Sequence, residues 1–117
     1  MPQILLESNK IKLTNLSKVL WPDDDITKAD FIKYYSEIAE VILPHLKDRP
    51  IVFTRFPDGI YGKAFYQKNA PDYAPEWLET FDILSDEGKI TSYIIINDNS
   101  SLLWAANQAS LELHPWL

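Results

Sequence analysis

Residues 27–44 read TKADFIKYYSEIAEVILP, and this stretch decides the fold class. Thr27 is a typical helix N-cap, and Asp30 three residues later fits the N3 position of a capping box. Because proline has no backbone N–H, Pro44 is expected to end the helix. One face of the stretch carries apolar side chains at helical spacing, namely Phe31, Tyr34, Tyr35, Ile38, Ala39, Val41 and Ile42. The sequence therefore predicts an amphipathic helix that starts after Thr27.

Short strands are predicted on both sides of this helix. Before it, Gln3–Glu7 and Lys10–Thr14 are typical of an opening hairpin, and residues 15–26 form a polar connection. After it, β-branched and aromatic residues predict strands at 50–56, 64–68, 90–96 and 111–114, with a short apolar segment at 76–83. A second helix is expected after the cap Asn97-Asp98-Asn99. The pattern predicts a mixed α/β (α+β) fold in a single domain, residues 1–117, with short strands and two main helices.

The composition excludes several classes of protein. A length of 117 residues fits one domain. The chain has no cysteine, which excludes disulfide frameworks, thiolate zinc sites and cysteine nucleophiles. No signal-peptide pattern is present, and no run of about 18 apolar residues occurs. We therefore expect a cytoplasmic protein that does not contact a membrane.

The net charge of −6 is unevenly distributed along the chain. Residues 1–70 contain ten basic and nine acidic residues, whereas in residues 71–117 Lys89 opposes eight acidic residues. The average charge argues against indiscriminate binding of polyanions. An anion site, if the chain has one, is expected in the first part.

Three polar residues in that first part form the first candidate site. Asn15 and Lys18 lie between apolar residues in a non-helical stretch, and Lys28 lies at the predicted helix start. Free backbone N–H groups and the positive end of the helix dipole favour an anion there. A lysine at this position opposes the dipole, and a phosphate bound between the lysine and the helix end is one reason to tolerate it. A plainer interpretation stays open, in which Lys28 is exposed and partly neutralised by Asp30.

A second candidate site combines aromatic and basic side chains. Phe65 and Tyr66 are adjacent in a predicted strand, so they point to opposite faces and at least one is expected to be accessible. An exposed ring near Arg55 and Lys68 is suited to stacking a nucleobase while the cations contact the backbone. The alternative is a strand buried on both faces, with ordinary surface lysines.

Metal-binding and catalytic motifs are not evident. His45 and His114 are far apart, and Asp23-Asp24-Asp25 lacks the spacing and glycine of an EF-hand loop, so we interpret it as a solvated loop. The glycine-rich nucleotide-binding motifs and the serine-hydrolase elbow are absent as well. We therefore assign no catalytic residue and no metal ligand from the residues themselves.

Ten segments together carry a family resemblance over nearly the whole chain. They are 13–22 (LTNLSKVLWP), 27–30 (TKAD), 34–35 (YY), 43–46 (LPHL), 49–50 (RP), 54–59 (TRFPDG), 65–71 (FYQKNAP), Trp77, 103–107 (LWAAN) and 111–115 (LELHP). In this order they resemble the N-terminal part of the polymerase domain of bacterial and archaeal ATP-dependent DNA ligase D, a primase-like nucleotidyltransferase of non-homologous end joining.

The resemblance implies roles for the two candidate sites. In the family, an asparagine and two lysines bind the 5′-phosphate of the downstream strand at a gap or break, which implies that role for Asn15, Lys18 and Lys28. An adjacent aromatic pair lies against the template strand, which implies stacking by Phe65 and Tyr66. Arg55, and more weakly Lys68, would contact the backbone there, and His114 corresponds to a histidine close to the nucleotide site.

The chain also departs from the family pattern. The family's polymerases hold two divalent metals with a D-x-D pair and a third aspartate, which correspond to none of these 117 residues; Asp23 and Asp25 do not occupy those positions. We therefore expect no cofactor in this chain, whereas Mn²⁺ or Mg²⁺ and a nucleotide are implied for the complete domain. Whether the chain acts as an enzyme is left open, and polymerase activity by this chain alone is not expected.

Two functions remain open at this stage. The first is the DNA-binding, 5′-phosphate-recognising part of a repair polymerase, located with the nucleoid in the cytoplasm. Its partners would be DNA ends or gaps and either the remainder of the polymerase and ligase protein or a partner subunit. The second is a small non-catalytic module for protein interaction or self-association, favoured by the acidic second part and by the open sheet edge of a truncated fold.

Overall fold

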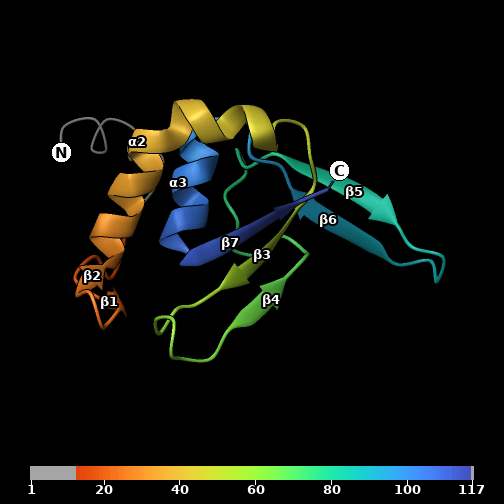
Figure 1. Cartoon of the computed structure of the whole chain (residues 1–117). Helices are drawn as coiled ribbons and strands as arrows, with labels where there is room; N and C mark the ends of the chain where they lie inside the picture. The colour runs from red at the N-terminus through yellow and green to blue at the C-terminus, as the bar shows by residue number, and fades with distance from the viewer. Residues whose placement is uncertain (1–12, 117) are drawn as a thin grey trace.

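Two helices lie side by side over an antiparallel sheet in the part of the chain that the structure, a computed structural model, describes, residues 13–116 (Figure 1). The helices are α2 (Lys28–Leu46) and α3 (Asn99–Asn107). The predicted opening hairpin lies outside the described residues, except for Leu13 and Thr14. A mixed α/β fold with two main helices was predicted, and this prediction is confirmed.

Helix α2 begins where its sequence predicts. Thr27 is the N-cap, its Oγ1 accepts a hydrogen bond from the Asp30 N–H at 3.3 Å, and Asp30 Oδ2 accepts one from the Thr27 N–H at 2.9 Å. The prediction that Pro44 ends the helix is wrong, because the helix continues to Leu46. Proline costs the helix one N–H bond and a steric clash with the carbonyl four residues earlier, and burial of Leu46 in the core offsets that cost in the last turn.

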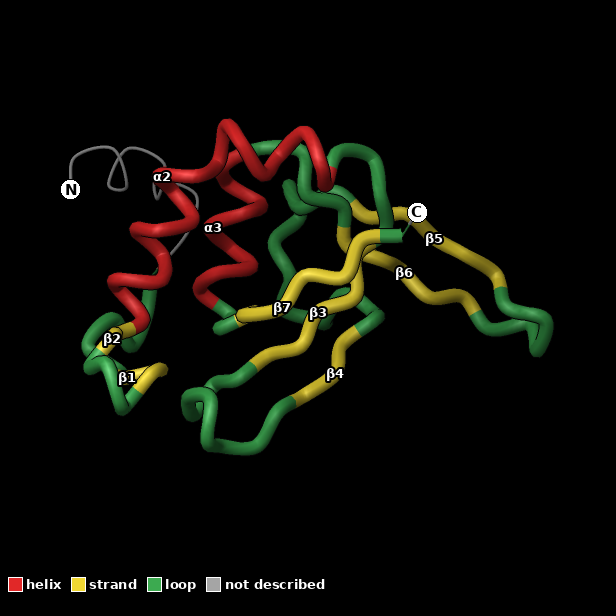
Figure 2. The backbone as a smooth tube through the Cα atoms, in the orientation of Figure 1, coloured by secondary structure: helices red, strands yellow, loops and turns green. Residues whose placement is uncertain are grey.

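Strand β3 (Ile51–Arg55) is the centre of the sheet. It pairs along its length with β7 (Ser110–Pro115) on one edge. The other edge pairs with β4 (Phe65–Gln67) at the Arg55 end and with β6 (Ile90–Ile94) at Ile51. Strand β5 (Thr80–Leu84) pairs only with β6 in this sheet, and Figure 2 shows this hairpin extending away from the helices. All of these pairs are antiparallel.

The connection before α2 contains regular structure that the sequence did not predict. Its strands β1 (Val19–Trp21) and β2 (Ile26–Thr27) form a two-stranded ribbon. The Ile60 N–H donates to the Leu20 carbonyl at 2.9 Å, and Gly59 has a φ of 91° and lies so close that a Cβ would be 3.0 Å from the same oxygen. The ribbon is therefore fixed against the β3–β4 connection.

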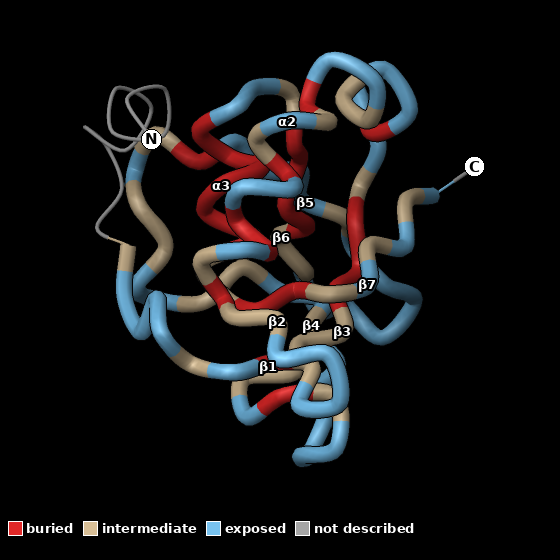
Figure 3. Tube along the Cα trace, turned by 60° about the vertical axis from the view of Figure 1, so that its left-hand side comes forward, coloured by how far each residue is buried: buried red, intermediate tan, exposed pale blue. Residues whose placement is uncertain are grey.

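The core lies between the helices and the sheet (Figure 3). It includes Phe53 of β3, Phe31 and Tyr35 of α2, and the run Ile94–Ile96, whose three side chains are all buried. Helix α3 is buried from Ser100 to Ala106, not on one side only. Neither described helix is long and apolar enough to cross a membrane.

Candidate nucleic-acid interface

Asn15, Lys18 and Lys28 come together in one cavity of about 190 Å³. Arg55 also lines this cavity, which we call the cationic cavity. Its other described lining residues are Thr14, Pro57, Asn107, Gln108 and Ala109. The structure thus brings the three residues of the first candidate site together and adds a third cation, Arg55, from the second candidate site.

Each charged side chain reaches the cavity from a different element. Lys18 follows a turn in which Asn15 has a φ of 54°, and its N–H donates to the Asn15 carbonyl at 3.0 Å. Lys28 is the first residue of α2, and Arg55 is the last residue of β3. Arg55 Nε donates to the Gln108 carbonyl at 2.9 Å, just after α3. The cavity therefore depends on packing between distant parts of the chain.

Lys28 is the most strongly perturbed group in the cavity. It is only 5% exposed, and its Nζ lies 3.5 Å from Thr14 Oγ1. Burial, followed by repulsion from Lys18 and from Arg55, lowers the pKa of Lys28 to about 8. The interpretation of Lys28 as an exposed lysine neutralised by Asp30 is wrong, because Lys28 is buried and Asp30 hydrogen-bonds to Thr27.

The charge of the cavity is not balanced from within. None of its described lining residues is acidic. Asp58, which is not one of the lining residues, binds Lys18 Nζ at 2.9 Å. Three cations held together in a partly desolvated cavity repel one another, and an anion that enters relieves this repulsion. The arrangement is suited to a compact ligand with more than one negative charge.

The start of α2 contributes to this cavity differently from what its sequence suggests. The Lys28 N–H donates to the Lys18 carbonyl at 2.7 Å, and the Ala29 N–H donates to the Leu16 carbonyl at 2.9 Å. The third N–H, that of Asp30, donates to Thr27 Oγ1. The expectation that free N–H groups of the first turn would hold an anion is therefore wrong for these three donors. Side chains are left to hold the ligand.

The aromatic pair of β4 is exposed on both sides of the sheet. Phe65 is 44% exposed and Tyr66 is 66% exposed, so the alternative of a strand buried on both faces is wrong. Residues directly opposite each other in a sheet share a face, and the register pairs Arg55 with Phe65 and Thr54 with Tyr66. Phe65 therefore lies on the face of Arg55, and Tyr66 lies on the other face.

His114 and Tyr66 meet on that other face. Their ring centroids are 6.4 Å apart, and His114 Nε2 lies 3.3 Å from Thr54 Oγ1 and 3.2 Å from Glu112 Oε1. Tyr66, one of the predicted template-contacting residues, and the nucleotide-proximal candidate His114 are thus neighbours on one face, whereas Phe65 and Arg55 lie on the other. Lys68 is exposed just after β4.

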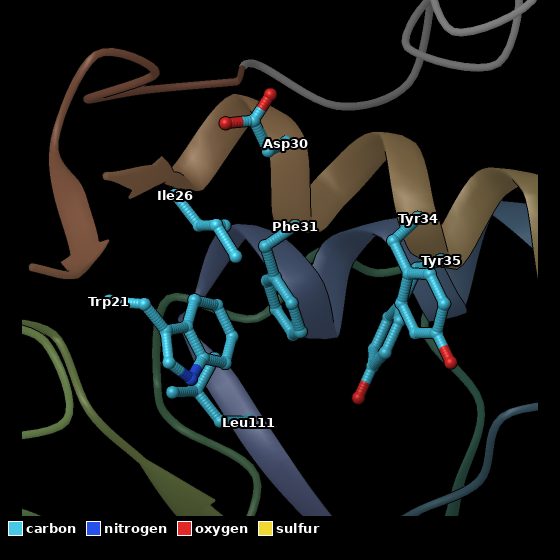
Figure 4. Close-up of a pocket in the computed structure, with 7 residues that line it drawn as sticks. All are labelled: Trp21, Ile26, Asp30, Phe31, Tyr34, Tyr35 and Leu111. Carbon is cyan, nitrogen blue, oxygen red and sulfur yellow. The ribbon is translucent and has the colours of Figure 1, made fainter. Parts of the chain in front are cut away.

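A second cavity, of about 420 Å³, lies against α2 (Figure 4). Among the described residues that line it, none is basic and Asp30 is the one acidic residue. The lining consists of Trp21, Ile26, Asp30, Phe31, Tyr34, Tyr35 and Leu111. The aromatic rings gather below the helix, and the Asp30 carboxylate points away from them. This apolar cavity is unsuited to a phosphate.

A metal site is not evident in residues 13–116, where no three His, Cys, Asp or Glu side chains gather in a metal-binding arrangement. Asp23 instead accepts a hydrogen bond from the Tyr61 hydroxyl. The described residues therefore do not provide the carboxylate set that divalent metals require.

Sequence reasoning missed two residues of the cationic cavity's surroundings. Arg55 was assigned to the second candidate site, and Asp58, 40 residues from Lys18, lay in a segment of the family resemblance but was given no role. The basic character of Arg55 was visible, but its neighbours depend on the register of β3 with β4 and β7. No local signal pairs Asp58 with Lys18.

Comparisons with known proteins agree with these features. A protein-family model for the LigD primase-polymerase domain matches residues 27–117. The multifunctional non-homologous end joining protein LigD of Mycolicibacterium smegmatis is 44% identical over 105 residues, and the bifunctional non-homologous end joining protein LigD of Bacillus subtilis is 40% identical over 105 residues. Each alignment covers 90% of this chain but only 14% and 16% of the respective relatives, so the chain spans less than a fifth of their length.

One solved structure is also similar to this chain. It is the polymerase domain from Mycobacterium tuberculosis ligase D in complex with DNA, with 39% sequence identity and a TM-score of 0.85. The match covers 90% of this chain and 36% of that chain.

Proposed function

Because this chain belongs to the LigD primase-polymerase family, we propose that it binds DNA at a gap or break and holds the 5′-phosphate of the downstream strand. Non-homologous end joining is the process in which such binding would serve. The proposal rests on one observation above all, the cavity in which Lys18, Lys28 and Arg55 meet with no acidic side chain among its described lining.

The charge of a terminal phosphate matches this cavity. A phosphate monoester carries a charge of about −1.5 to −2 at neutral pH, whereas a diester inside a strand carries one negative charge. In the proposal, Lys28 and Lys18 donate charge-assisted hydrogen bonds to the phosphate, and the Asn15 amide donates another. Arg55 adds positive charge at the same point, while its Nε is held by the Gln108 carbonyl.

This proposal is tested with paired duplexes. A gapped DNA with a 5′-phosphate and the same DNA with a 5′-hydroxyl are titrated into the protein at one fixed salt concentration, followed by fluorescence anisotropy. The 5′-phosphorylated DNA is expected to bind about tenfold or more tightly, the effect of a single hydrogen bond to a charged group. Equal dissociation constants would contradict the proposal.

The template strand would lie along β4. Phe65 lies on the Arg55 face of the sheet, and Lys63 Nζ lies 5.4 Å from its ring. In the proposal this ring stacks on a base near the phosphate-bound strand. Tyr66 and His114 would face the nucleotide side, with Lys68 contacting the backbone. The surface then has two stacking positions, one on each face of β4.

Removal of either ring should weaken DNA binding without unfolding the protein. Phe65→Ala and Tyr66→Ala are each expected to cost about 1–3 kcal/mol of binding free energy, the range for base stacking on an aromatic ring. Phe81→Ala is the matched control, because Phe81 is an exposed aromatic on β5, which does not pair with β4. If Phe65→Ala and Tyr66→Ala both bind gapped DNA as tightly as Phe81→Ala and the unsubstituted protein, the stacking role is wrong.

We propose that residues 1–117 form the N-terminal portion of a larger catalytic domain. The match of this chain to 36% of the solved polymerase domain supports this proposal. Divalent metal and nucleotide binding would belong to the complete domain, and we derive no catalytic step for this chain. Its partners would be DNA ends or gaps and the rest of a LigD protein, or a subunit that supplies it. Such a chain would act beside the nucleoid in the cytoplasm.

A second candidate function is a protein-interaction or self-association module. The specific observation in its favour is the apolar cavity lined by Trp21, Phe31 and Tyr35, which protein surface could fill. The two functions are compatible, because this cavity and the cationic cavity share no lining residue.

A further inference from the structure

The ion pair between Lys18 and Asp58 lies at the margin of the cationic cavity. Lys18 Nζ and Asp58 Oδ1 are 2.9 Å apart, and both side chains are partly exposed to solvent. Asp58 is not one of the residues that line the cavity, whereas Lys18 is. The carboxylate therefore contacts the lysine from outside, and the cavity side of the ammonium group is left for a ligand.

Among residues 13–116, Asp58 is the one acidic residue that pairs with the Lys18 ammonium group beside the other cations. Lys18 lowers the pKa of Lys28 by repulsion, so the two ammonium groups are close enough to disfavour each other. A lysine side chain is flexible and loses rotamer entropy when it is held, so an exposed one would turn away from like charges into solvent. Some anchor is needed to hold it at the cavity in the free protein.

We propose that Asp58 is a positioning residue, which holds the Lys18 ammonium group at the mouth of the cationic cavity before the phosphate arrives. The inference rests on the proposed 5′-phosphate function of the cavity and adds to it a residue that would not touch the ligand. An ammonium group has three donors, so Lys18 keeps two for the phosphate while one remains on Asp58.

Both ends of the ion pair are anchored to the same rigid unit. The backbone of Asp58 lies in a tight turn closed by the Gly59 N–H donating to the Phe56 carbonyl at 3.0 Å. Two residues on, Ile60 bonds to Leu20 of the β1 strand, which directly follows the Lys18 segment. At the other end, the Lys18 carbonyl accepts the Lys28 N–H at 2.7 Å. Anchored backbones on both sides are what preorganisation of a side chain requires.

The test compares Asp58→Asn with Asp58→Glu, using gapped DNA that carries a 5′-phosphate or a 5′-hydroxyl. Asp58→Asn is expected to weaken binding of the phosphorylated DNA about three- to fivefold, the scale of a partly exposed ion pair, and Asp58→Glu to restore most of the loss. In a protein that already carries Lys18→Met, adding Asp58→Asn is expected to cause no further loss of affinity for the phosphorylated DNA. Thermal unfolding of each variant verifies that the fold is retained.

A second measurement separates positioning from a merely structural role. If Asp58→Asn releases Lys18, repulsion on Lys28 falls, and the pKa of Lys28 measured by NMR should rise from about 8. The other charged neighbour that lowers this pKa, Arg55, is unchanged in the variant, as is the burial of Lys28.

Two results would overturn the inference: unchanged or tighter binding of phosphorylated DNA by Asp58→Asn, or a Lys28 pKa that does not rise. Failure of the proposed function looks different, because the unsubstituted protein would then bind the two DNAs equally. A preference in the unsubstituted protein that Asp58→Asn leaves intact contradicts only the role of Asp58.

Discussion

Replacing Lys28 by methionine should remove much of the preference for a 5′-phosphate and at the same time stabilise the fold. The lost charge-assisted hydrogen bond is worth about 1.5–3 kcal/mol, so the affinity for phosphorylated DNA should fall roughly 10- to 100-fold towards that for the 5′-hydroxyl. Stability should rise by about 1 kcal/mol or more, because methionine fills a similar volume without burying a charge among Lys18 and Arg55. Anisotropy titrations and urea unfolding measure the two effects.

The pH dependence of the unsubstituted protein follows from the same group. The pKa of Lys28 is about 8 in the folded protein, whereas the ordinary value for a lysine, which applies to the unfolded chain, is 10.5. Between these two pH values the unfolded chain binds more protons than the folded protein, so the free energy of unfolding rises with pH. Phosphate binding needs the protonated lysine, so affinity for phosphorylated DNA should fall as pH rises above about 8. Lys28→Met should show neither trend.

Lys33→Met is the matched control for this substitution. Lys33 lies on the same helix but is exposed, with Glu37 Oε1 3.8 Å from its Nζ. Its loss should leave the preference for a 5′-phosphate unchanged. A Lys28→Met protein that keeps the full preference would show that the phosphate binds elsewhere.

Phe53→Ala should cost more stability than any surface substitution considered above. Phe53 is 1% exposed and lies in β3, paired with Gln67 on one side and Leu113 on the other. Truncating a fully buried phenylalanine leaves a cavity and typically costs about 3–5 kcal/mol. A domain of this size has about 5–15 kcal/mol in total, so much of its stability would be lost.

Phe53→Ala should also affect DNA binding. Arg55 lies two residues further along β3, so loosening this strand should also weaken binding of phosphorylated DNA. Phe81→Ala on β5 should change the free energy of unfolding by less than about 0.5 kcal/mol, because Phe81 is exposed. Equal stability of the Phe53→Ala and Phe81→Ala proteins in urea would contradict β3 as the centre of the core.

Local signals predicted the parts of the fold that local interactions decide. The start of α2 was predictable because the capping box joins Thr27 and Asp30, which are three residues apart. The end of α2 was not, because burial of Leu46 depends on the core and not on Pro44. The β1–β2 ribbon was missed because it is short and encloses an acidic turn, in which Asp25 adopts a φ of 54°.

The candidate site shows the same division. The family resemblance pointed to Asn15, Lys18 and Lys28, which the structure brings into one cavity, while their role remains a proposal. Arg55 lines the same cavity and donates to the Gln108 carbonyl, a contact between distant parts of the chain that no periodicity reveals. Long-range contacts of this kind appear only when the chain is folded.

The pKa of Lys28 in the free and DNA-bound protein tests the central claim most directly. It can be followed by NMR of the side-chain methylene next to Nζ, with gapped DNA carrying either a 5′-phosphate or a 5′-hydroxyl. A phosphate bound in the cationic cavity should raise this pKa from about 8 towards its ordinary value of 10.5, and the 5′-hydroxyl DNA should raise it much less. An unchanged Lys28 pKa in a protein saturated with 5′-phosphorylated DNA would contradict the assignment of the cavity.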